Sequence, residues 1–420
     1  MAIELYKHNK KAYSNVLEHF ETTNRTCVVH ATGTGKSFIS LKWLEDNKDK
    51  KCLFLAPTNA IIDQFKTHIE DNGLSLSDFP NLEFELYTNV NNRIADNKYD
   101  CIVMDEFHRC GAKEWSKGIN KLLDNNEDAK VLGLSATPIR YLDDNRNMAD
   151  EIFNGNIASE ISIAEAIAMG ILQAPTYITS IYSFDNEIDK IQNQIDKYKN
   201  KEEKKELQKK LDEAKNMLEK SRGLSEVFEK YIKNDKGKYI VFCKDKPHME
   251  LMEEKSNEWF KNINKIKVND VYYEKGRELN KYEIDSFENN ERDELKLLFA
   301  IEMLNEGVHV KSIDGVIMFR PTVSPIIYFQ QLGRALSVGH NEHPIVFDVV
   351  NNYECLDQIH TLKDEVEKII DKAIDDINNG IVPFDGYVDV DSYKFKNILN
   401  GFNIIDCNTD IKQILDKFDV

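Results

Sequence analysis

The alternation of short, almost wholly apolar runs with longer amphipathic stretches constrains the fold of this chain more than any other feature. Four such runs lie in its first half, at 26–31, 51–56, 100–104 and 130–135. A run without polar alternation is typical of a parallel strand buried on both faces, and the stretch at 58–70 has the apolar spacing of a helix. Residues 25 to 175 therefore predict an open α/β sheet.

The first apolar run leads into the turn ATGTGKS. Gly33 and Gly35 allow the backbone to point several N–H groups at a phosphate, and the helix that follows adds its positive N-terminal end. Lys36 is expected to reach the β- and γ-phosphates of a nucleotide, and Ser37 to ligate magnesium. The strict pattern has glycine where this chain has His30, so an ordinary strand-to-helix turn is the alternative. The residues expected to line the nucleotide are Thr32, Gly33, Thr34, Gly35, Lys36 and Ser37.

The third run ends in the stretch CIVMDEFHR, which places two carboxylates at another strand end. Asp105 is expected to hold magnesium, and Glu106 to orient and deprotonate an attacking water. An Asp-Glu pair after a strand is common, so its significance depends on the presence of Lys36 in the same sheet.

The second half of the chain repeats the pattern of the first. Its apolar runs lie at 238–243, 295–300, 315–319 and 344–350. They predict a second buried α/β sheet. No second Gly-x-Gly-Lys-Ser occurs there, so this half is expected to complete the nucleotide site of the first half and to bind no second nucleotide.

Six short segments follow one another along the chain: ATGTGKS, APTNAIIDQF, DEFH, LGLSATP, AIEMLNEGVHV and YFQQLGRALS. In this order the chain resembles the superfamily 2 helicases of the DExH type, and among them the bacterial branch related to type III restriction helicase subunits. The order and spacing of the segments are far more specific than any single one.

The resemblance implies two RecA-like lobes with ATP and Mg²⁺ bound in the cleft between them. Gln330 and the arginine finger Arg334 would reach over from the second lobe to stabilise charge on the transferring phosphoryl group. The catalytic residues implied are Lys36, Glu106, Gln330 and Arg334, and the magnesium ligands are Ser37 and Asp105.

The resemblance also implies residues that couple the nucleotide to nucleic acid, namely His108, Ser135 and Thr137. Contacts to the nucleic-acid backbone are expected from Thr58, Thr88, Asn305, Glu306 and Gly307, because hydroxyl and N–H groups that bind phosphate suit a motor that ignores sequence. For Thr58, a helix cap is the alternative.

Three positions depart from the family pattern. Ser337 stands where a second arginine is common, so catalysis would depend on Arg334 or on another cation such as Arg320. His309 replaces an aspartate. Asn9 stands where the family has an adenine-reading glutamine, and it keeps the carboxamide on a shorter side chain; a solvated helix position is the alternative for Asn9.

Two segments lie outside the six motifs. Residues 185–222 are rich in helix formers and change apolar register midway, which predicts a helical hairpin. It is interpreted as a charged linker, with an arm that guides nucleic acid or docks a partner as the alternative. After residue 352, apolar residues at helical spacing predict an amphipathic helix. The expected domains are a first lobe at 1–175, an insertion at 176–223, a second lobe at 224–352 and a small helical extension at 353–420.

The composition limits the class of protein. The formal charge of −18 argues against coating nucleic acid over the whole surface, so contacts should be local. The seven cysteines include no C-x-x-C pair, no apolar run is long enough to span a bilayer, and the N-terminus lacks a signal peptide, which predicts a cytoplasmic location.

These patterns predict an ATP-dependent helicase or translocase with nucleic acid as partner, DNA in preference to RNA. The alternatives are an ATPase switch that binds nucleic acid without unwinding it, a helicase subunit of a restriction or defence complex with a protein partner, and a P-loop protein with no nucleic-acid role.

Overall fold

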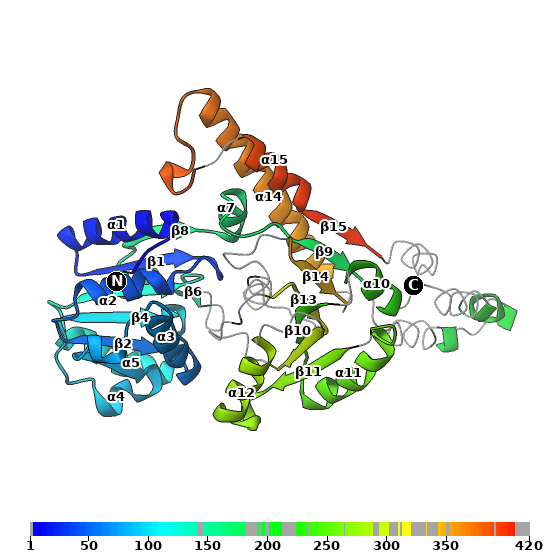
Figure 1. Ribbon diagram of the computed structural model, residues 1–420, viewed down its shortest axis with the longest axis horizontal. Helices are drawn as coiled ribbons and strands as arrows, with labels where there is room; N and C mark the ends of the chain where they lie inside the picture. The colour runs from blue at the N-terminus through cyan, green and yellow to red at the C-terminus, as the bar shows by residue number, and fades with distance from the viewer. Residues whose placement is uncertain are drawn as a thin grey trace.

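The computed structural model describes most of the chain. The described residues are 3–140, 146–180, 192, 195–197, 201–202, 204–209, 211, 224–232, 236–263, 265–288, 294–301, 310, 313–320, 333, 343–349, 353–389 and 392–407. Within them, two parallel sheets with flanking helices form two lobes (Figure 1). The expected α/β class with two RecA-like lobes is confirmed.

The first sheet has the strand order β3-β2-β4-β5-β1-β8 among the described residues, and every pairing in it is parallel. Its strands are β1 (Arg25–His30), β2 (Cys52–Ala56), β3 (Leu82–Leu86), β4 (Cys101–Asp105), β5 (Lys130–Ser135) and β8 (Ile157–Ile161). Its helices are α1 (Lys7–Thr22), α2 (Ser37–Asp46), α3 (Asn59–Asp71), α4 (Val90–Arg93), α5 (Lys113–Asn125), α6 (Met148–Phe153) and α7 (Ile163–Ala168). A separate antiparallel pair joins β6 (Ile139–Arg140) to β7 (Arg146–Asn147).

The apolar runs of the sequence become the interior strands of this sheet. All residues of β2 and β4 are buried, as are all but the first residue of β1 and β5. Because the strands are parallel, the turn after β1, the carboxylates after β4 and the turn after β5 meet at one edge of the sheet.

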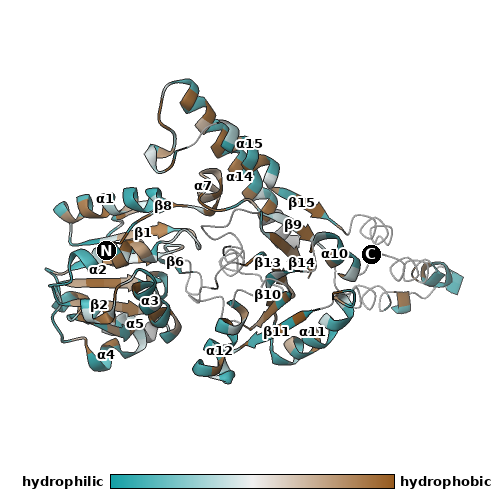
Figure 2. Cartoon of the chain, viewed as in Figure 1, coloured by the Kyte–Doolittle hydropathy of each residue, from teal (hydrophilic) through white to brown (hydrophobic). Residues whose placement is uncertain are grey.

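The second sheet has the order β11-β12-β10-β13-β14-β9-β15 among the described residues, again with only parallel pairings. Its strands are β9 (Thr176–Thr179), β10 (Gly237–Phe242), β11 (Ile266–Val271), β12 (Leu295–Ala300), β13 (Gly315–Met318), β14 (Ile345–Asp348) and β15 (Asn403–Asp406). Its helices are α10 (Leu224–Tyr231), α11 (Lys246–Trp259), α12 (Arg277–Glu288), α14 (Tyr353–Asn378) and α15 (Ser392–Gly401). Figure 2 shows the apolar strands in brown between helices that are largely teal on their outer sides.

The second sheet reaches beyond the expected boundary of its lobe at 224–352. β9 comes from the segment expected to be an insertion, and β15 comes from the extension expected to be helical. β9 pairs with β14 on one side and with β15 on the other. Both segments therefore belong in part to the second lobe, and the division at 176, 224 and 353 is corrected accordingly.

The described residues of 185–222 agree with a helical hairpin. The carboxamides of Gln192 and Gln208 exchange hydrogen bonds of 2.8 and 3.2 Å, and Lys204 lies 2.9 Å from the carboxylate of Asp196. The pair Asp196–Lys204 lies inside the pair Gln192–Gln208 along the sequence, which is the order that two antiparallel helices produce. Ile195 and Leu211 are buried.

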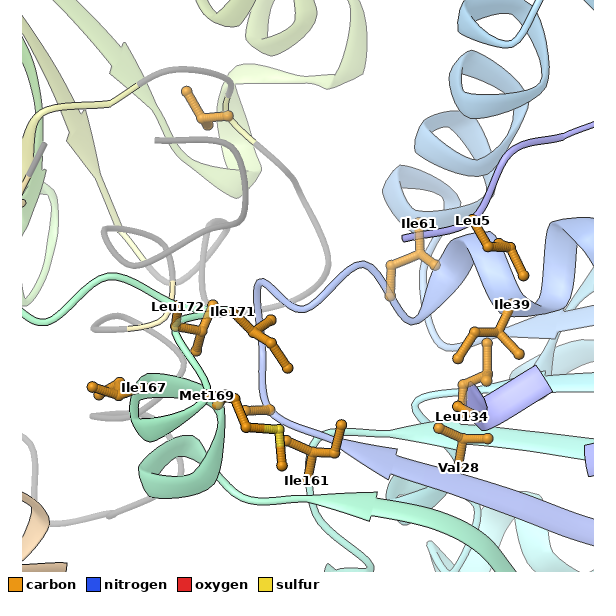
Figure 3. Packing of buried hydrophobic residues seen from close by; sticks show 14 of the residues in the cluster. Leu5, Val28, Ile39, Ile61, Leu134, Ile161, Ile167, Met169, Ile171 and Leu172 are labelled. Carbon is orange, nitrogen blue, oxygen red and sulfur yellow. The ribbon is translucent and has the colours of Figure 1, made fainter. Parts of the chain in front are cut away.

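One apolar cluster combines residues of both lobes. It includes Val28 and Leu134 of the first sheet and Val346 of the second. Between the lobes it continues through α7 and the residues that follow, where Figure 3 shows Met169 beside Ile161. Residues 163–174, which connect the two lobes, therefore form an apolar junction rather than a solvated linker. In the part of the chain that the structure describes, no helix is long and apolar enough to cross a membrane.

Candidate functional site

The turn after β1 has the backbone of a phosphate-binding loop. Gly33 and Gly35 adopt φ angles of 90° and 78°, in the left-handed region that glycine enters without strain. The side chain and amide of Thr34 both donate to the carbonyl of Ala31, at 2.9 and 3.4 Å. Lys36 occupies the N-cap position of α2, so the turn lies at the positive end of that helix.

The lysine and the first carboxylate of the site are both buried. Lys36 is 8% exposed and Asp105 is 6% exposed. Burial and the nearby charge of Glu106 raise the pKa of Asp105 to about 7, while the positive charge of Lys36 opposes that rise. Two carboxylates held this close favour a bound cation, and a lysine beside them favours a bound anion; the site therefore fits a magnesium nucleotide.

Glu106 has a backbone conformation that is rare for a residue with a side chain. Its φ angle is 51°, in the left-handed region, and its amide donates to the Asp105 carboxylate at 3.0 Å. The backbone carbonyl of Asp105 accepts a hydrogen bond of 2.8 Å from the buried hydroxyl of Tyr87. Such conformations persist where the surroundings fix them, and they concentrate at functional sites.

The three residues expected to couple the site to nucleic acid lie together. Nδ1 of His108 is 2.8 Å from Oγ of Ser135 and 3.3 Å from Oε2 of Glu106. The Ser135 hydroxyl donates to the carbonyl of Thr137 at 2.6 Å. The structure therefore connects the carboxylate at the end of β4 to the turn that follows β5.

Asn9 supports the phosphate-binding turn from α1. Its Nδ2 donates to the carbonyls of Thr34 and Gly35 at 3.2 and 3.1 Å, and its side chain is 0% exposed. The alternative of a solvated helix position is therefore wrong. Its Oδ1 is buried and has no hydrogen-bond partner among the described residues.

The second lobe touches the phosphate-binding turn at Gly333. A Cβ atom built on Gly333 would lie 2.8 Å from Cβ of Thr32 and 3.2 Å from its carbonyl oxygen. Only glycine permits this approach between the lobes. The neighbouring predicted residues Gln330, Arg334, Asn305, Glu306, Gly307, His309 and Ser337 lie outside the described residues.

The two threonines expected to contact nucleic acid differ in their surroundings. Thr58 lies at the N-cap position of α3, yet its side chain makes no capping hydrogen bond and its Oγ1 is buried without a partner. The capping alternative therefore does not explain Thr58. Thr88 is exposed, and its hydroxyl lies 3.5 Å from Oδ1 of Asn89.

The structure adds residues that the motifs do not indicate. His8 Nε2 lies 2.8 Å from the Thr34 carbonyl, and Tyr87 holds the carbonyl of Asp105. Both contacts join segments far apart in the sequence, so no local pattern points to them. Within the described ranges, no group of three His, Cys, Asp or Glu residues could hold a metal ion.

Two family models match the chain. The type III restriction enzyme res subunit matches residues 2–85 and 76–140, and the helicase conserved C-terminal domain matches residues 219–339. A 51.5 kDa protein of a Lactococcus phage (isolate 7-9) is 24% identical over 354 residues, which are 80% of this chain and 68% of that protein.

Solved structures share the fold at low identity. The ATP-dependent type ISP restriction-modification enzyme LlaBIII bound to DNA has a TM-score of 0.61 and 16% identity, over 99% of this chain and 32% of that one. A putative HsdR subunit of a type I restriction enzyme from Vibrio vulnificus has a TM-score of 0.54 and 20% identity, over 83% and 64%. The Hef helicase domain of Pyrococcus furiosus has a TM-score of 0.50 and 17% identity, over 84% and 98%. The chain thus spans about a third of the LlaBIII chain and just under two thirds of the HsdR fragment.

Proposed function

We propose that this chain is a superfamily 2 helicase protein related to the res subunits of type III restriction enzymes, and that it hydrolyses ATP between its lobes to move along DNA. The observation that carries the proposal is the contact of Gly333 with Thr32, because it places a residue from the second half of the chain against the phosphate-binding turn of the first lobe. A P-loop protein without a motor role has no need of this contact.

The chemistry assigned to the first lobe follows from its buried charges. Lys36 neutralises phosphate charge, Ser37 and Asp105 hold magnesium, and the metal when bound neutralises charge on the β- and γ-phosphates. Glu106 orients the attacking water and accepts its proton. The buried setting strengthens each of these electrostatic interactions relative to water.

We assign to the second lobe the side chains that act on the γ-phosphate during hydrolysis. Arg334 stabilises the charge that develops there, and Gln330 orients the water beside it. Gly333 itself can lie this close to the turn only because it has no side chain, since a Cβ there would overlap Thr32. Loss of the γ-phosphate then removes the interaction that holds the lobes closed.

Several observations support nucleic acid as the polymer along which the protein moves. The hydroxyl of Thr58 has no hydrogen-bond partner among the described residues, which suits a phosphate contact. His108 and Ser135 connect the catalytic carboxylate to the strand end next to it. LlaBIII, a protein of the same fold, is bound to DNA in its structure, which favours DNA over RNA. The likeness to a putative HsdR subunit of a type I restriction enzyme favours a second candidate, a helicase subunit that acts with a protein partner.

Steady-state ATPase activity tests the proposal. It is measured without nucleic acid and with single-stranded DNA, duplex DNA or RNA, for the parent, Glu106→Gln and the control Glu127→Gln, whose side chain is exposed. Stimulation by DNA that disappears only in Glu106→Gln supports the motor. Strand separation on a partial duplex then distinguishes a helicase from a switch. A rate that no nucleic acid changes would overturn the autonomous motor and favour the partner-dependent subunit.

A further inference from the structure

The residue before the phosphate-binding turn, His30, has contacts that the proposed chemistry does not use. His30 is the last residue of β1 and is 0% exposed. Its Nε2 lies 2.7 Å from Oγ of Ser159, and its Nδ1 is buried with no hydrogen-bond partner in the described part of the chain. Burial, followed by the charges of His8 and Lys36, lowers the pKa of His30 to about 3, so the ring is neutral and accepts or donates one hydrogen bond at Nε2.

Ser159 connects His30 to the C-terminal extension. Its hydroxyl lies 2.7 Å from the hydroxyl of Tyr387, although the two residues are 228 positions apart. Asn15 Nδ2 donates to the same tyrosine oxygen at 3.2 Å. These contacts form one series of hydrogen bonds, in which Asn15 donates to Tyr387, Tyr387 to Ser159 and Ser159 to His30. In this arrangement each of the two hydroxyl groups both donates and accepts one hydrogen bond.

Tyr387 therefore contacts both supports of the turn. Asn15 belongs to α1, the helix whose Asn9 and His8 bind the carbonyls of Thr34 and Gly35. Ser159 belongs to β8, which also holds the first residue of the turn, because the amide of Ala31 donates to the carbonyl of Ile161 at 2.9 Å. A shift of the tyrosine hydroxyl would be transmitted to each end of the turn.

The loop that presents Tyr387 has a defined and uncommon backbone. Phe384, Asp385 and Gly386 have φ angles of 53°, 47° and 76°, three left-handed residues in succession. Residues with a side chain keep this conformation only where contacts fix it. Phe384 packs edge-to-face on Phe395 of α15, and Asp389 forms an ion pair with Lys7 of α1.

The other end of the extension is part of the second lobe. β15 pairs with β9 along four residues, and Thr179 donates to the Asp406 carboxylate at 3.0 Å. Figure 1 shows the extension in orange and red, running from β15 beside β9 to the loop above α1. The extension is thus built into one lobe and bonded to the other, at the base of the phosphate-binding turn.

We propose that Tyr387 is a positioning residue for nucleotide binding: through Ser159 and His30 on one side and Asn15 on the other, it holds the phosphate-binding turn in its binding geometry. Nucleotide affinity in the first lobe then depends on a segment anchored in the second. This inference rests on the proposed function only in taking the ligand of the turn to be ATP.

The test uses Tyr387→Phe, which keeps the ring and removes the hydroxyl, in the full chain. The matched control is Tyr393→Phe in α15, whose ring is 72% exposed. The readouts are the Kd of a fluorescent, non-hydrolysable ATP analogue, the KM and kcat for ATP, and the thermal unfolding midpoint. Loss of the two hydrogen bonds of the Tyr387 hydroxyl, to Ser159 and from Asn15, should weaken analogue binding and raise KM roughly fivefold, with kcat changed less than about twofold. Tyr393→Phe should match the parent.

A second variant separates positioning from general stability. Ser159→Ala breaks the same chain at another point, so it should weaken the analogue to a similar extent, and the double variant should be no weaker than the weaker single variant. Unchanged analogue affinity in either single variant, with or without a lower unfolding midpoint, would overturn the inference, as would full additivity in the double variant. The analogue Kd decides the inference whether or not the parent hydrolyses ATP, whereas hydrolysis decides the proposed function.

Discussion

Nδ1 of His108 lies 2.8 Å from Oγ of Ser135, and this hydrogen bond joins the short helical turn after β4 to the last residue of the neighbouring strand β5. His108 also approaches Oε2 of Glu106 at 3.3 Å, while Ser135 donates to the carbonyl of Thr137. The contact therefore links the carboxylate assigned to water activation with the turn that follows β5.

Ser135→Ala should separate hydrolysis from its stimulation. The variant keeps Lys36, Asp105 and Glu106, so basal ATPase activity should persist within about threefold, but stimulation by DNA should fall roughly five- to tenfold because one linking hydrogen bond is lost. The measurement is ATPase rate against DNA concentration. Ser116→Ala on α5 serves as control, and equal stimulation in both variants would contradict the coupling role of Ser135.

Asn9→Asp should weaken ATP binding. The amide nitrogen of Asn9 donates to two backbone carbonyls of the turn. A carboxylate at this buried position has no hydrogen to donate, so its oxygens would face the carbonyl oxygens and repel them. The cost of such a buried mismatch is of the order of 1–3 kcal/mol, so KM for ATP should rise about 10- to 100-fold.

The control for Asn9→Asp is Asn92→Asp, which places the same charge on the exposed surface of α4. Nucleotide titration measures the difference between the two variants. An unchanged ATP affinity in Asn9→Asp would show that the turn keeps its geometry without the two hydrogen bonds.

The sequence predicts the interior strands of both sheets except the four-residue β9, and it misses the edge strands. The edge strands are β3, β8, β11 and β15, and no apolar run marks any of them. An edge strand is covered on fewer sides, so residues such as those of IKVNDV in β11 remain partly polar and lack the continuous apolar signal of a central strand. A strand can be predicted from the sequence when burial on both faces gives it a continuous apolar run.

The candidate site likewise has residues that the sequence predicts and contacts that it does not. Lys36, Asp105 and Glu106 follow central strands in short motifs, so their positions are readable from local spacing. The bonds of Asn9 to the turn, and of Tyr387 to Ser159, join residues brought together only by the folded chain. Neither contact has a local sequence signal, because each depends on how α1 and the C-terminal extension pack on the first sheet.

Gly333→Ala should uncouple ATP binding from hydrolysis. The added Cβ would lie 2.8 Å from Cβ of Thr32, closer than such atoms approach, so the segment of the second lobe must move away from the turn. Overpacking of this kind costs of the order of 1–3 kcal/mol, and kcat should fall about tenfold or more while Kd for a non-hydrolysable ATP analogue changes little.

Gly380→Ala is the control for Gly333→Ala, since a Cβ at Gly380 meets no atom within 4 Å although its φ angle of 73° strains an alanine. It should lower stability without lowering kcat. Comparable kcat in the two glycine variants would mean that the contact of Gly333 with Thr32 has no part in catalysis.

Glu253 in α11 should make stability depend on pH. Burial raises its pKa to about 7, with the charges of Asp270, Glu250 and Glu283 adding to the effect and Lys275 opposing it. The unfolded value is about 4.3, so the folded state binds the proton more tightly. Its contribution to stability is therefore fully present below pH 4 and is lost as pH rises through 7.

Glu253→Gln removes this ionisation, so the variant should lose less stability than the parent between pH 5 and pH 8. Urea unfolding at several pH values measures the difference, and the variant minus parent comparison cancels the other titrating groups. Glu254→Gln, whose side chain is exposed on the same helix, should follow the parent. Parallel curves for Glu253→Gln and the parent would mean that the Glu253 carboxylate is as well solvated in the folded state as in the unfolded chain.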